Sequence, residues 1–275
     1  MTGPQQRRMG WILVGMLVAT ALWITNHILI AAHIRTPFYS GWLLLAMVVF
    51  LAAFGVRKKL TFLPPTLIFG GNAATWLRCH IFMGLLSAAV FGLHAGFRLP
   101  TGFVETTLAA LFLGTFLSGV AGLILSRVVP ARLTSRGEEV LFERIPMFRS
   151  RLRTEVEELV AAAAEKSGDS ALIEFYETHL KEFFSGPKHL LEHLIANKRP
   201  RRRLLQHAEN CRRFLSDPEH AQLDRITQLI QMKDDLDFHL ALQGALKAWL
   251  FVHLPLTCGL LIVAVFHLLL VHAFT

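Results

Sequence analysis

The chain has 275 residues, of which 53% are hydrophobic and 17% are charged, and its mean hydropathy is +0.45. Soluble domains carry about 25% charged residues, so this composition indicates a membrane protein and excludes a disordered chain. The three cysteines form no CxxC pair and no CxxCH motif. This pattern argues against a cysteine-built zinc or iron–sulfur site and against covalently attached haem.

The net charge of +8 is distributed unevenly along the chain. Between Arg127 and Lys247, 20 basic residues accompany 19 acidic ones, whereas the rest of the chain has eight basic residues and a single acid, Glu105. The positive surplus therefore belongs to the apolar part, where lysine and arginine orient membrane helices. This distribution favours a membrane role over nucleic-acid binding.

Five apolar segments are long enough to cross a membrane, since a spanning helix needs about 20 residues. They cover about Gly10–Ala32, Phe38–Val56, Ala73–Phe97, Gly102–Leu125 and Leu246–Phe274. Basic residues precede the first segment and follow the second and fourth. The positive-inside rule then predicts a multi-pass protein of the inner (cytoplasmic) membrane, with a cytoplasmic N-terminus and parallel third and fifth spans. The first span is expected to be an uncleaved signal anchor.

The segment between the fourth and fifth spans is polar, and its apolar residues recur at helical intervals. We expect an all-α protein in which residues 1–126 hold spans one to four, 127–245 form a helical cytoplasmic insert, and 246–275 hold the fifth span. Breaks at Gly168, Gly186-Pro187, Pro200 and Asp217-Pro218 predict four or five helices in the insert. We expect its charged residues to form ion pairs on helix surfaces. The insert is therefore predicted to be a docking or assembly module without catalytic residues.

Four of the 13 histidines form a pattern on two of the predicted spans. His80 and His94 lie on the third span, and His253 and His267 lie on the fifth, with 14 residues from one to the next in each case. Fourteen helical residues fall 40° short of four turns, so each pair shares one helix face at depths about 21 Å apart. Parallel spans would place His80 level with His253, and His94 level with His267.

Two facing imidazoles at each depth suit the axial ligation of haem iron. Iron with both axial positions filled favours electron transfer over substrate binding, and two haems would divide the membrane crossing into shorter steps. Small residues, Gly84 and Ser87, lie between the histidines of the third span, with Phe91 as apolar bulk. Arg78 and Arg98 are the expected partners of the haem propionates.

The stretches Trp76–Arg98 and Trp249–His267 resemble bacterial diheme b-type membrane cytochromes and the ferric-reductase-like and NADPH-oxidase transmembrane domain. This resemblance implies two non-covalent haem b groups that carry electrons across the membrane. The flavin and nicotinamide domain of that family is missing here, and the chain has no GxGxxG fingerprint. The long helical insert is also foreign to the family pattern. The chain therefore resembles one subunit of a longer electron route more than a stand-alone enzyme.

The expected function is transmembrane electron transfer within a respiratory or redox complex, between quinone or quinol and a peripheral redox protein. That protein would be a c-type cytochrome or a flavin or iron–sulfur subunit. An outer-face metalloreductase or oxidase supplied with reductant by another subunit is one alternative. A haem-free membrane anchor or a transporter with proton-relaying histidines is another.

Other polar residues outside this pattern have simpler explanations. His27 and His33 could touch a quinone or a propionate, although packing or exposure is favoured. His189 and His193 are four residues apart, which suits either a metal or a solvated helix face, and the second is favoured. The basic run from Arg199 to Arg203 suits anionic lipid, an acidic partner or a solvated turn equally well.

Overall fold

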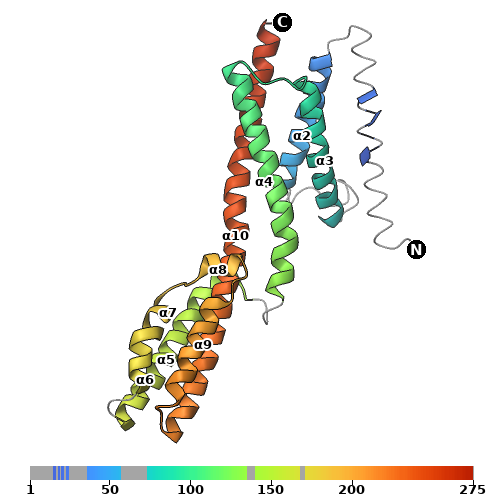
Figure 1. The fold of residues 1–275 in the computed structure, drawn as a ribbon. Helices are drawn as coiled ribbons and strands as arrows, with labels where there is room; N and C mark the ends of the chain where they lie inside the picture. The colour runs from blue at the N-terminus through green and yellow to red at the C-terminus, as the bar shows by residue number, and fades with distance from the viewer. Residues whose placement is uncertain are drawn as a thin grey trace, which may run out of the picture. The chain divides into compact units, whose positions relative to one another are not determined.

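The structure is a computed structural model that describes residues 36–56, 73–134, 140–167 and 171–274, together with a few positions between 15 and 24. The described residues are almost entirely helical and contain no β-strand, which confirms the predicted all-α fold. They divide into two compact units (Figure 1). Unit 1 comprises residues 1–123 and 249–275, and unit 2 comprises residues 124–248.

Four helices in the described part of the chain are long and apolar enough to cross a membrane. They are α2 (Thr36–Val56), α3 (Ala73–His94), α4 (Phe103–Leu133) and α10 (Asp217–Phe274). These helices contain the second to fifth predicted spans. The first predicted span, Gly10–Ala32, lies almost wholly outside the described residues.

Side-chain contacts give the order of the four helices around unit 1. The contacts join α2 to α3, α3 to α4, α4 to α10, and α10 back to α2. Examples are the Phe50–Trp76 stack, the Phe91–Phe112 stack, the hydrogen bond from Trp249 Nε1 to Ser118 O, and the Trp42–His272 ring contact. Each of the four helices is thus linked by side chains to two others in this unit.

A small apolar core lies between the two histidine levels. Val48 of α2, Phe112 of α4 and Leu260 of α10 are buried together, and Phe91 of α3 packs against them. The rings of Phe91 and Phe112 stack with centroids 4.2 Å apart. All four helices thus contribute to one water-excluding layer. Outside it, little of each span is covered by protein, since only 6–17% of each apolar window is buried.

Unit 2 is a separate bundle of helices with its own core. Its elements are the end of α4, the 3₁₀ turn η1 (Phe142–Arg144), α5 (Ile145–Ser167), α6 (Ala171–Phe175), the π-helical turn η2 (Tyr176–Leu180), α7 (Lys181–Ser185), α8 (Leu190–Leu194), α9 (Arg199–Arg212) and α10 up to Ala248. The apolar residues that recur at helical intervals in the sequence are the ones buried here, including Val156, Leu172 and Ile226.

The helix boundaries in unit 2 follow the breaks predicted from the sequence, with one difference at the C-terminal side. Helix α7 ends before Gly186, α9 begins at Arg199 with Pro200 in its first turn, and α10 begins at Asp217. Helix α10 then continues without interruption through the predicted start of the fifth span at Leu246. Between Glu219 and Leu254 the sequence contains no proline and a single glycine, Gly244, so nothing there terminates a helix.

Candidate functional site

The first histidine level brings together two residues from opposite helices of unit 1. His80 of α3 and His253 of α10 are close enough for their rings to interact electrostatically. Both side chains are partly buried. The sequence predicts this pairing from the parallel direction of the two spans, and it stays a prediction beyond the electrostatic interaction of the two rings.

Ser118 of α4 is a hydrogen-bonding partner of His253. Its Oγ lies 2.6 Å from His253 Nδ1 and 3.3 Å from Thr115 O. When the hydroxyl proton goes to Thr115 O, Ser118 Oγ accepts from His253 Nδ1–H. In that tautomer the lone pair of His253 resides on Nε2, the nitrogen that would ligate a metal.

Trp249 holds the same histidine from one turn earlier on α10. Its ring stacks on the His253 ring with centroids 5.4 Å apart, and its Nε1 donates to Ser118 O at 2.7 Å. Gly122 makes room for this tryptophan, because a Cβ at position 122 would lie 2.0 Å from Trp249 Cζ2. The sequence analysis did not identify Ser118 or Gly122. The only available signal was their small side chains on the fourth span.

His80 is held more loosely on the opposite helix. Its ring lies against Phe54 of α2 with centroids 4.9 Å apart. The backbone of Leu51 on α2 is also close enough to interact with the imidazole.

The second histidine level has a different construction. His94 Nδ1 lies 3.2 Å from Ser40 Oγ of α2, and a Cβ at Gly41 would lie 2.9 Å from His94 Cε1. His94 is therefore packed closely on α2, at a place where the sequence provides a serine and a glycine. Ser40 is a hydrogen-bonding neighbour of the same kind as Ser118 at the first level.

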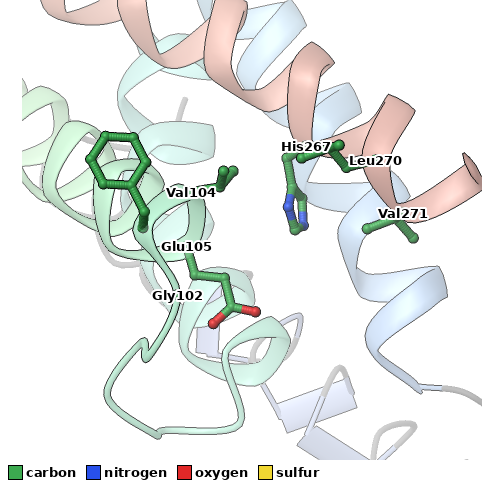
Figure 2. A pocket seen from close by; sticks show the side chains of 7 residues that line it. Gly102, Val104, Glu105, His267, Leu270 and Val271 are labelled. Atoms are coloured by element: carbon green, nitrogen blue, oxygen red, sulfur yellow. The ribbon is translucent and has the colours of Figure 1, made fainter. Parts of the chain in front are cut away.

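His267 lines a pocket at the N-terminal end of α4. The pocket has a volume of about 350 Å³ and is formed by Gly102, Phe103, Val104, Glu105, His267, Leu270 and Val271. Figure 2 shows the imidazole and the Glu105 carboxylate directed into the same opening. The contacts described for His94 and His267 thus go to different helices. Glu105, the one acid outside the balanced segment, was not among the predicted site residues.

The two arginines predicted to meet propionates are both accessible. Arg78 and Arg98 are exposed, and neither forms an ion pair with any residue in the described ranges. Arg78 precedes His80 by two residues, and Arg98 follows His94 by four. Both therefore lie near their histidine levels along the chain and remain available to an anionic group.

The remaining predicted histidines have varied surroundings. His27 and His33 lie outside the described residues. His272 is exposed, yet its ring contacts Phe38 and Trp42 of α2, with both centroid distances at 5.9 Å. The prediction that His189 and His193 share a solvated helix face is wrong. His193 is 4% exposed and lies 3.5 Å from Asp234, whereas His189 precedes the short helix in a left-handed conformation.

The charged residues of unit 2 are not all surface pairs, which corrects the sequence expectation. Lys233 and Asp237 form an ion pair in which both side chains are 1% exposed, and Arg149 lies 3.5 Å from Asp237. Burial lowers the pKa of Lys233 to about 8, against the opposing attraction of Asp237. The ammonium also lies 4.0 Å from the centre of the Phe183 ring. This network is structural, since it lies inside the helical core.

The donor set of unit 1 limits which metal group it could hold. In the described ranges, no cluster of three or more His, Cys, Asp or Glu side chains could bind a bare metal ion. A histidine pair such as His80 and His253 supplies only two ligands. Haem fits this set, because its porphyrin supplies four nitrogens and needs two axial ligands from the protein.

Comparison with known proteins gives no family assignment for this chain. The functional interpretation therefore depends on the residues and contacts described above. No protein-family model, no curated protein and no solved structure matches the chain.

Proposed function

We propose that this protein transfers electrons across a membrane through two non-covalently bound b-type haems. His80 and His253 would be the axial ligands of the inner haem, and His94 and His267 those of the outer haem. The observation that carries the proposal is the meeting of His80 and His253 from opposite helices, with Ser118 leaving Nε2 of His253 available. The outer pair rests on the equal 14-residue separation.

Bis-histidine haem accepts and donates single electrons and leaves no open position for a substrate. The protein side chains would provide the conditions for that chemistry. Ser118 holds one ligand in the correct tautomer, and Trp249 holds its ring plane. The apolar layer of Val48, Phe112 and Leu260 keeps water out between the two levels. Arg78 and Arg98 would neutralise propionates.

The proposed setting is the inner membrane, with the N-terminus in the cytoplasm, as the basic flanks predict. Quinone or quinol is the proposed lipid-soluble partner, because the apolar helices are compatible with contact to lipid. A c-type cytochrome or a flavin or iron–sulfur subunit would exchange electrons at the membrane surface. The protein would then be an electron-transfer subunit of an oxidoreductase complex.

One observation favours a second function, reduction of a metal or of oxygen at the outer face. The pocket that contains His267 also contains Glu105, and a carboxylate beside an imidazole can attract a cationic substrate. This candidate still needs reductant from another subunit. A ferric-chelate assay on the purified protein, compared with a quinol-oxidation assay, distinguishes the two functions.

The deciding experiment is an absorption spectrum with haem quantified per chain. We expect two haems that acid-acetone extracts, because the chain has no CxxCH motif. His80→Ala and His253→Ala should remove the same spectral component, and His94→Ala and His267→Ala the other. The control is His272→Ala, which changes an exposed histidine on the same helix as His253.

Three outcomes of that experiment contradict the proposal. A properly inserted chain without haem would favour a haem-free anchor or a proton-relaying transporter. One haem per chain would remove the outer site. If His80→Ala instead matches His267→Ala, the two spans are antiparallel and the proposed topology is wrong.

A further inference from the structure

The short helix α8 of unit 2 exposes two bulky apolar side chains. Leu191 is 75% exposed and Ile195 is 76% exposed, one turn apart on or next to the helix. Their neighbour Leu194 faces inward and packs with Val129 and Leu133 at the end of α4. The segment thus exposes one apolar face, while its other face is packed against α4.

The fold holds this segment firmly in place. Arg132 donates hydrogen bonds to the carbonyl oxygens of His193 and Leu194 at the C-terminal end of α8. The backbone N–H of Lys188 donates to Asp237 at 3.0 Å. The helix is bracketed by His189 and Ala196, both in the left-handed region with φ of 56° and 59°. Such strain is retained only where the surroundings enforce it, so the exposure belongs to the folded state.

Exposed basic side chains follow this segment directly in the sequence. Lys198, Arg199, Arg202 and Arg203 are exposed and form no ion pair with any residue in the described ranges. The nearby acids are already engaged. Glu192 lies 3.8 Å from His189, and Asp235 lies 3.3 Å from Arg201. We define Leu191, Ile195, Lys198, Arg199, Arg202 and Arg203 as the α8 patch.

Helix α8 packs against the parts of α4 and α10 that lead, along the chain, into the predicted spans. Arg132, which holds α8, comes seven residues after Leu125, the last residue of the predicted fourth span, or about 10 Å along a helix. Leu242 and Leu246 of α10 pack in the same apolar cluster as Leu194, and the fifth span is predicted to begin at Leu246. The headgroup region is roughly 5–8 Å thick on each side, so Arg132 lies a few ångströms beyond its outer edge along the chain.

We propose that the α8 patch binds the anionic phospholipid surface of the membrane that the chain spans. Leu191 and Ile195 would insert among the lipid headgroups, and the four basic side chains would contact lipid phosphates. Apolar insertion combined with cationic attraction is the usual basis of interfacial anchoring. This inference depends on the spans and not on the haem proposal, so either can fail alone.

Amide hydrogen exchange on the full-length protein in lipid nanodiscs tests the anchor. We expect residues 190–203 to exchange several-fold more slowly in discs that contain phosphatidylglycerol than in phosphatidylcholine alone. High salt should weaken this difference, because the phosphate contacts are screened. Equal exchange in both kinds of disc overturns the proposal.

Two double variants, one at the N-terminal side of α9 and one at its C-terminal side, compare the patch with an equally exposed surface. Ile195→Ser/Arg199→Gln removes one apolar and one basic member of the patch and should abolish the slowing caused by phosphatidylglycerol. Phe214→Ser/Arg213→Gln changes an equally exposed pair, with Phe214 78% exposed, at the far end of the same helix and should keep it. If the first variant unfolds, Arg202→Gln/Arg203→Gln replaces it.

Other occupants of the α8 patch would give different results. Slowing that is independent of lipid charge and increases with protein concentration identifies a second copy of the chain and contradicts the lipid assignment. Slowing that is retained in both Ile195→Ser/Arg199→Gln and Arg202→Gln/Arg203→Gln also contradicts it, because the proposed contacts would then be absent.

Discussion

Ser118 illustrates how a single hydroxyl prepares a candidate ligand. It accepts from His253 Nδ1–H when its own proton goes to Thr115 O. Partners of this kind raise the basicity of a metal-bound imidazole and fix its ring, and their loss typically lowers metal affinity about 10- to 100-fold. The role of Ser118 is positioning, since it acts through His253.

We therefore expect Ser118→Ala to keep the protein folded but to weaken retention of the inner haem by about 10- to 100-fold. The midpoint potential of that haem should become more positive, because a less basic imidazole stabilises ferric iron less. Redox titration with haem quantification measures both effects. Ser87→Ala is the control, since Ser87 is a buried serine whose hydroxyl donates to Gly84 O within its own helix. An unchanged potential in Ser118→Ala would contradict the positioning role.

Lys233 gives unit 2 a titration that exposed lysines do not have. Its ammonium faces Asp237, Asp234, Arg149 and the Phe183 ring, and burial lowers its pKa to about 8. Between about pH 8 and the usual lysine value of 10.5, the unfolded chain binds more protons at this residue than the folded one. The contribution of Lys233 to the free energy of unfolding therefore rises with pH across that window.

Replacing Lys233 tests this sign directly. From pH 8 to 10, the stability of the natural protein relative to Lys233→Met should increase by about 1–3 kcal/mol. Thermal unfolding of unit 2, followed over that pH range, measures the difference. Lys181→Met is the matched control, because Lys181 forms an exposed i,i+4 pair with Glu177. A flat difference for Lys233→Met would show that Lys233 keeps an ordinary pKa.

At the residue scale, the burial of Lys233 and Asp237 could be predicted in part from the sequence. Lys233 and Asp237 continue the helical interval set by Ile226, Leu229 and Ile230, so their position on the buried face was available from periodicity. Charged residues at such positions are usually assigned to the surface, because burial of an ion is costly. The structure resolves the conflict by pairing them. Sequence spacing predicted a His80–His253 pair, but it could not point to Ser118, whose contact depends on how α4 packs against α10.

At the element scale, α4 and α10 approach most closely where Gly122 meets Trp249. The structure leaves no space for a side chain at Gly122, since an added Cβ would overlap the indole. Trp249 in turn stacks on His253 and bonds to Ser118 O. A change at Gly122 is therefore transmitted to the histidine through one rigid ring.

We expect Gly122→Ala to displace Trp249 and to cost about 1–3 kcal/mol of stability, as overpacking typically does. The inner haem should be lost or become spectrally heterogeneous while the outer one is retained. Gly114→Ala on the same helix is the control, because its Cβ would make an ordinary 3.6 Å contact with Leu256 Cδ2. Low-temperature absorption spectra of both variants decide the matter. Equal haem content in the two variants would argue against the tight contact.

Element boundaries show where sequence reasoning succeeds and where it stops. The end of α7 and the starts of α9 and α10 were predictable, because Gly186-Pro187, Pro200 and Asp217-Pro218 act locally on the backbone. The left-handed residues His189 and Ala196 were not, since neither residue type favours that conformation. The surrounding bundle imposes it. The exposure of Leu191 and Ile195 follows from that tertiary constraint.

At the scale of the whole molecule, the described residues form two units, each with its own apolar core. Unit 2 buries a much larger set of side chains than unit 1 does. A separate core means that unit 2 does not need the spans to satisfy its apolar faces. A docking or assembly role for residues 127–245, between the fourth and fifth predicted spans, stays a prediction that is compatible with such a core.

Replacing residues 137–243 by a short flexible linker tests that role. Both haems should remain bound, because the four histidines and Ser118 all belong to unit 1. Association with a partner subunit, or turnover in the native membrane, should be lost. Haem per chain and electron transfer in native membranes are the measurements. Full electron transfer in the linker variant would contradict the docking role, and loss of the inner haem would show a structural role instead.

The sparse burial of the spans has a consequence for the amount of assembled protein in the membrane. Lipid does not press apolar helices together, so a four-helix arrangement with only 6–17% of each window buried is held by few direct contacts. A group bound between α3 and α10 would then be a large part of what keeps the helices assembled, and its concentration would set the folded fraction by mass action. If that group is the proposed haem, chains made during iron scarcity would be less firmly assembled, and the folded fraction would follow haem supply.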